Sequence, residues 1–159
     1  MAMNAFLKID GIKGESKNEK RKDEIDVESW SIGAYQPTVT AGGGQGKGKA
    51  SVSNFNVRHK IDRASPTLLK YCLTGKPIKE VVLTECKAGG EELAYLKYTF
   101  GDVVIAGVTS ANGDEANNTT EMISLSFKTM QMEYTPQNEQ GGGEGPVRVG
   151  WDVEKNTEM

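Results

Sequence analysis

A glycine-rich segment is the part of the chain whose residue types and spacing come nearest to a nucleotide site. Residues 43–49 satisfy the spacing G-x-x-x-x-G-K, in which backbone N–H groups and a lysine would cradle phosphates. A phosphate loop then needs Ser or Thr to hold magnesium and a helix after it, whereas Ala50 comes next and a strand is predicted to follow. We therefore interpret residues 40–49 as a flexible projection with two lysines, whose backbone can order against another surface.

The single histidine, His59, lies between two basic residues in a predicted strand. Basic neighbours disfavour its protonated form, and no nucleophile motif accompanies it, so we expect a surface or strand-edge histidine. The chain has no C-x-x-C or H-E-x-x-H pattern, and the acidic loop 112–115 lacks the ligand series of a calcium loop. The sequence thus predicts no catalytic residue, no metal and no cofactor, and we expect that the protein is not an enzyme.

Composition and charge argue against several other classes. The 159 residues fit one domain, 1–159, and 19 basic against 22 acidic side chains give a net charge of -3, which is unlike a nucleic-acid-binding protein. The acidic excess falls in a tail at residues 137–159. The longest apolar run, 103–106, is far short of the roughly 20 residues that span a bilayer, so no membrane insertion is expected. Residues 1–8 do not have the pattern of a signal peptide.

Short apolar segments separated by Gly, Asn, Asp and Pro recur along the chain, a pattern typical of an all-β protein. We predict a mainly β fold, a single β-barrel or sandwich of about seven to nine antiparallel strands. The candidate strands are residues 5–9, 25–34, 51–60, 78–87, 93–100, 103–110, 122–134 and 147–153. In the last of these, Val147, Val149, Trp151 and Val153 alternate with other residues, so an apolar inward face is expected.

The apolar pattern changes phase within the predicted strand 122–134. Ile123 and Leu125 share one face, whereas the apolar residues after position 129 lie on the other, and a similar change occurs within 25–34. Either a β-bulge or burial of both faces, one of them by a neighbouring chain, would produce this pattern. The segment 103–108 is apolar on both faces, which favours the second explanation there and suggests self-association.

One short α-helix is predicted to flank the strands, at about residues 66–74. Ser65 is a typical N-cap residue and Pro66 suits the first helical position, while Gly75 can end the helix after Thr74 in the left-handed conformation. Leucines and Cys72 at i, i+4 spacing form one broad apolar side. That side needs a sheet to cover it.

The two cysteines and two tryptophans are assigned to the core, although these residue types have functional roles in other proteins. Cys72 and Cys86 could form only one bridge, and a chain without a secretory signal is expected to keep its thiols reduced. We interpret both as small buried hydrophobes. Trp30 and Trp151 are likewise expected in the core rather than at a functional site.

Charged residues of both signs cluster between Lys13 and Asp26. The simpler interpretation is a solvated hairpin loop. The alternative is polar complementarity at a subunit contact, where charge sets register and orientation more than affinity.

Several blocks of sequence, taken together, resemble the Hcp family, the haemolysin-coregulated proteins that form the inner tube of type VI secretion systems. The blocks are KGES at 13–16, IDV at 25–27, SWSIG at 29–33, KID at 60–62, SPTL at 65–68, KAGGE at 87–91, YTPQ at 134–137, GPV at 145–147 and GWD at 150–152. Their order and spacing extend the resemblance over about residues 5–156. Asp152 stands where relatives often carry Asn, which is a small departure.

The resemblance implies a β-barrel protomer with one flanking helix that closes into a homohexameric ring. Rings stack into a hollow tube inside a contractile sheath, behind a spike, and small effector proteins are held in the lumen. The tube would assemble in the cytoplasm and then be secreted by the type VI system, which agrees with the lack of a signal peptide. A ring of this kind needs two different, complementary faces on each protomer.

The resemblance also implies two sites. Ser31 corresponds by position to the family's lumen-facing residue in the second strand, and we expect it to contact cargo; the alternative is a strand hydroxyl satisfied by a neighbouring residue. An extended loop corresponds to one that reaches neighbouring subunits or rings; its residues here include Thr40, Gly42, Gly43, Gly44, Gly46, Lys47, Gly48 and Lys49. The alternative function is a small-ligand-binding β-barrel without tube assembly, which would leave the two-sided strands unexplained.

Overall fold

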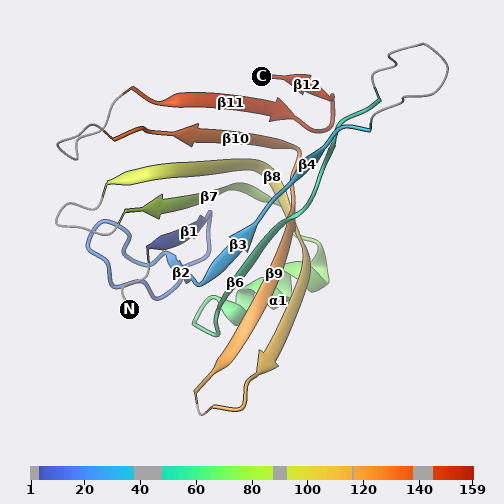
Figure 1. The fold of residues 1–159 in the computed structure, drawn as a ribbon. Helices are drawn as coiled ribbons and strands as arrows, with labels where there is room; N and C mark the ends of the chain where they lie inside the picture. Colours follow the sequence, from blue (N-terminus) through green and yellow to red (C-terminus); the bar gives the residue numbers. More distant parts are fainter. Residues whose placement is uncertain (1–3, 38–47, 88–92, 116, 138–144) are drawn as a thin grey trace.

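The computed structural model describes residues 4–37, 48–87, 93–115, 117–137 and 145–159. Within them the chain forms twelve strands and one helix (Figure 1). The elements are β1 Ala5–Ile9, β2 Ile25–Val27, β3 Ser29–Ser31, β4 Ala34–Tyr35, β5 Ser51–Val52, β6 Phe55–Lys60, α1 Ser65–Thr74, β7 Ile78–Cys86, β8 Ala94–Asn112, β9 Thr119–Ser126, β10 Thr129–Tyr134, β11 Val147–Asp152 and β12 Thr157–Glu158. The predicted mainly β fold with one short helix is confirmed.

The strands pair antiparallel in two sheets that share the long strand β8. Its first part lies in the order β12-β11-β10-β8-β7-β1-β2, here named sheet A, and its second part lies in the order β3-β6-β9-β8, here named sheet B. A separate ribbon joins β4 to β5. Figure 1 shows β8 curving from one sheet into the other. A single strand thereby connects both layers.

The chain also passes between the two sheets at β2 and β3. β2 pairs with β1 in sheet A, and β3 pairs with β6 in sheet B. Between them, the Glu28 N–H donates to the Arg58 carbonyl at 2.9 Å. The far side stays open, because β12 pairs only with β11 in the described part of the chain. The arrangement is an open, sandwich-like barrel rather than a closed one.

The core fills the space between the sheets. Phe55 of β6 and Phe100 of β8 are fully buried and stack with 4.6 Å between ring centroids. Trp30, predicted in the core, is half-buried and packs against the core, edge-on to Tyr98 at 5.5 Å and against Phe55 at 6.1 Å. Aromatic pairs of this kind add to the stability that their buried area supplies. Trp151 is likewise half-buried.

The changes of apolar phase mark passages of the chain between the sheets. The predicted strand 122–134 is two strands: β9 belongs to sheet B and β10 to sheet A. The segment 25–34 divides in the same way into β2, β3 and the start of β4. The core-facing side of a strand reverses when the strand crosses to the opposite layer, so no bulge is needed at these two places.

The predicted strands 93–100 and 103–110 are instead one strand, β8. Val103 pairs with β7, and the residues from Val104 onward pair with β9. The register with β9 shifts between Ile105 and Gly107, as at a β-bulge. The bulge lies where β8 leaves sheet A for sheet B, so it helps this strand to bend.

The helix ends as predicted but begins differently. Gly75 has φ 69°, and its N–H donates to the Tyr71 carbonyl, which is the expected left-handed C-cap. The N-cap residue is Ala64 and not Ser65, and it makes no side-chain cap. The Asp62 carboxylate instead accepts the Ala64 N–H at 2.9 Å, while the Ser65 hydroxyl accepts the Asp62 N–H at 3.1 Å.

The helix packs through a narrower side than its sequence pattern indicates. Leu68 is fully buried, whereas Leu69 and Leu73 are 47% and 77% exposed. Cys86 is a buried free thiol, but Cys72 is only half-buried, so the prediction of two buried cysteines is half right. No helix in the described residues is long and apolar enough to cross a membrane.

Candidate functional site

Ser31 lies at the end of β3, on the side of sheet B that faces away from the core. In the register of β3 with β6, Ser31 lies beside Asn56 and Ser29 beside Arg58. Arg58 is in turn opposite Met122 of β9. We call this side the outer face of sheet B. It comprises Ser29, Ser31, Asn56, Arg58, Lys60, Gly107, Thr109, Ala111, Thr120, Met122 and Ser124.

The outer face of sheet B is polar and slightly hollowed beside Ser31. Ser31 is exposed, and its hydroxyl makes no hydrogen bond to any other described residue. A shallow pocket of about 100 Å³ adjoins it, lined by Ser29, Trp30, Ser31, Asn56, Val57, Arg58 and Met122. A free hydroxyl beside a small pocket is available for contact with another molecule.

In the chain the predicted contact loop lies between β4 and β5, which form a ribbon in which Tyr35 pairs with Ser51. Gly48 and Lys49 are the only two named loop residues within the described ranges; Thr40, Gly42, Gly43, Gly44, Gly46 and Lys47 lie outside them. The Gly48 carbonyl accepts a hydrogen bond from Gln36 Nε2 at 2.6 Å, and Lys49 is exposed. A strand follows the loop, as predicted, so it does not lead into the helix that a phosphate loop requires.

An exposed apolar strip runs along β10 and β11. Tyr134 pairs with Val147 and Met132 with Val149, on the core-facing side of sheet A. Tyr134, Val147 and Val149 are nevertheless 42%, 65% and 50% exposed. The predicted alternation of β11 and the inward direction of its apolar face are correct, but Val147 and Val149 on that face stay exposed in the protomer. We name this set of residues the apolar strip. It comprises Tyr134, Val147 and Val149, together with the half-buried Met132 and Trp151.

Sheet B has two unlike free edges. Within the described ranges, β3 pairs only with β6, and residues 104–112 of β8 pair only with β9. The second backbone edge of each strand therefore presents N–H and C=O groups without a partner strand. Such edges readily pair with a strand of another chain.

His59 faces the core, contrary to the expected surface or edge position. Its side chain is fully buried, and its Nε2 lies 3.0 Å from Oε1 of Glu121, the residue opposite on β9. Its Nδ1 lies 3.8 Å from the Asp62 carboxylate. Burial raises the pKa of Asp62, and the nearby His59 partly opposes that rise. The sequence signal was there: Phe55 and Val57 alternate with polar residues, and His59 continues their row.

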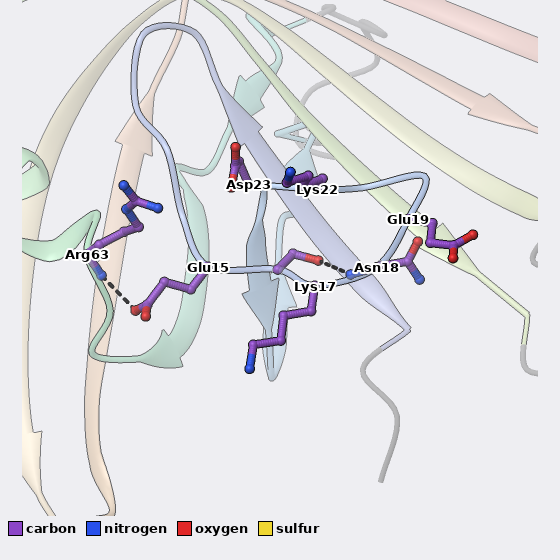
Figure 2. A pocket seen from close by; sticks show the side chains of 8 residues that line it. Glu15, Lys17, Asn18, Glu19, Lys22, Asp23 and Arg63 are labelled. Carbon is purple, nitrogen blue, oxygen red and sulfur yellow. Dashed lines mark hydrogen bonds between the residues drawn. The ribbon is translucent and has the colours of Figure 1, made fainter.

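The charged segment between Lys13 and Asp26 forms a loop closed by its own backbone. The Gly14 N–H donates to the Asp23 carbonyl at 2.7 Å, in agreement with the simpler prediction of a hairpin loop. With Arg63 the loop lines a pocket of about 430 Å³ (Figure 2). Glu15 joins the two parts by accepting the Arg63 backbone N–H at 2.8 Å. A subunit contact through this loop stays a prediction.

The chain is similar to known proteins over nearly its whole length. Residues 6–134 match a family described as type VI secretion system effector, Hcp. The chain is 37% identical to protein hcp1 of Pseudomonas aeruginosa, over 99% of both chains. It is similar to the crystal structure of Hcp1 from Salmonella typhimurium, with 43% identity, full coverage of both chains and a TM-score of 0.83. Hcp2 of the same organism is 40% identical, with a TM-score of 0.76 over 98% of this chain and 99% of its own.

Proposed function

The chain belongs to the Hcp family of type VI secretion tube proteins, and from this we propose that six copies close into a ring whose stacking builds the tube. Rings of this kind would enclose small effector proteins in the lumen, inside a sheath and behind a spike. The protein would assemble in the cytoplasm before secretion and act without catalysis.

The observation that carries the ring is the pair of unlike free edges of sheet B. A closed ring needs heterologous contacts, in which one surface of each protomer meets a different surface of the next. If β3 of one copy lies beside residues 104–112 of the next copy, sheet B continues around the ring and both free edges are paired. The outer face of sheet B, with Ser31, would then line the lumen. The neighbouring copy would also cover the apolar strip, since exposed apolar patches commonly mark protein contacts.

The β4–β5 ribbon supports the second proposed contact. Its two strands precede and follow the predicted contact loop in the chain, and Lys49, just before β5, is exposed. We propose that this loop reaches a neighbouring subunit or ring.

Native mass spectrometry tests the ring directly. A particle of six times the 17.2 kDa chain mass is expected. A stable monomer at all working concentrations would contradict the ring and favour the alternative, a ligand-binding barrel without assembly.

Replacing Ser31 with Glu is expected to weaken cargo retention while leaving ring mass unchanged. The new side chain would fill the shallow pocket and place a charge on the lumen face. The backbone of β3, whose free edge is the proposed ring contact, would not change. Co-purification of a small effector with rings of the native protein and of S31E measures the effect. Thr157→Glu, at an exposed position of β12, is the matched control. Equal retention by S31E and T157E would remove Ser31 from the cargo site.

A further inference from the structure

The charged side chains on the outer face of sheet B are all basic. Arg58 and Lys60 are exposed there, and no Asp or Glu lies on this face within the described residues. Glu121 belongs to the neighbouring strand but points into the core, where it pairs with His59. Arg58 forms no ion pair with another described residue. Its guanidinium is thus an unneutralised charge with several donors on a surface of hydroxyls and amides.

A large apolar side chain lies directly opposite this charge. Met122 is 49% exposed and pairs with Arg58 across β6 and β9. Both residues line the pocket of about 100 Å³ that also includes Ser31. Methionine adapts its flexible thioether to differently shaped partners, which suits a surface that contacts more than one molecule. One small region therefore combines a cation, a hydroxyl and an adaptable apolar contact.

We propose that this region makes the outer face of sheet B selective for small proteins with an acidic surface. A carboxylate of the cargo enters the pocket and accepts hydrogen bonds from Arg58 and Ser31, while its methylene groups pack on Met122. Arginine binds carboxylates particularly well because its planar fork can donate two parallel hydrogen bonds. The inference rests on the proposed function, since cargo meets this face only if it lines the lumen. Six copies per ring would repeat the contact and add their effects.

The test uses assembled rings and a charge-reversed pair of probes, one small helical protein in a net acidic and a net basic version. Retention of each probe is measured by co-sedimentation with rings of the native protein, R58Q and R58E. Arg148→Gln is the matched control, because Arg148 is exposed on β11 and points away from the apolar strip. Ring mass is recorded for every variant by native mass spectrometry, so loss of assembly is separated from loss of selectivity.

We expect native rings to retain the acidic probe better than the basic one, and less strongly as salt is raised. R58Q should lose about tenfold in affinity for the acidic probe, as expected for one charged hydrogen bond, and R58E should reverse the preference. R148Q should behave as the native protein. Intact native rings that hold both probes equally, or intact R58E rings that keep the native preference, would overturn the selectivity alone. Failure of the native chain to form rings would overturn the proposed function and this inference with it.

Discussion

Replacing Val149 with Glu is expected to convert rings into monomers. Val149 is half exposed on the apolar strip and pairs with Met132, so the folded protomer has room for a polar side chain there. In the ring the same carboxylate would be covered by the neighbouring copy without a partner, and burying an unpaired charge costs several kcal/mol per site. Because the cost recurs at each of the six contacts, native mass spectrometry should find almost only single chains.

Gln131→Glu is the matched control for Val149→Glu. Gln131 is exposed on β10, next to Gly150 of β11, but it points to the opposite side of sheet A from the apolar strip. It receives the same new side chain at nearly the same place along the sheet. Q131E should form rings like the native protein, and circular dichroism should find both variants folded. If V149E is folded and still assembles into complete rings, the apolar strip is not a ring contact.

The second large effect is expected in the buried pair of His59 and Glu121. His59→Ala removes the hydrogen-bond partner of a carboxylate that is only 2% exposed. Leaving a buried charge unpaired costs about 3–5 kcal/mol, a large part of the total free energy of unfolding of an ordinary domain. The urea midpoint should fall by more than about 1 M. Variants are compared at equal chain concentration, since association adds a concentration-dependent contribution to stability.

A double variant separates the loss of this pair from general damage to the core. Replacing both His59 and Glu121 with Leu should recover most of the stability that H59A loses, because no charge then stays buried without a partner. Lys60→Ala changes the next residue of β6, which is exposed, and should alter the free energy of unfolding by less than about 0.5 kcal/mol. An H59A midpoint equal to that of K60A would show that the pair contributes no net stability.

Most of the local structure could be predicted from patterns in the sequence. Short apolar segments marked the strands, Gly75 ended the helix in the left-handed conformation, and the row of Phe55 and Val57 gave β6 a buried face. These features depend on the conformational preferences of single residues and on alternation along a strand, both of which act over a few residues. For the site, the resemblance of several sequence blocks pointed to Ser31, and alternation on β3 accounts for its exposure.

Coverage of a strand face by another layer depends on tertiary contacts that the local pattern does not contain. Alternation predicted an inward apolar face for β11, and the face does point inward, but Val147 and Val149 on it are exposed. Conversely, the charged neighbours of His59 led to the expectation of a surface position. Its strand, β6, lies between β3 and β9, and its side chain is buried in the core. The change of apolar phase in residues 122–134 marks the point where the chain passes from sheet B to sheet A, which local alternation did not predict. Burial depends on what lies opposite a strand, and that is set by pairings between residues far apart in the chain.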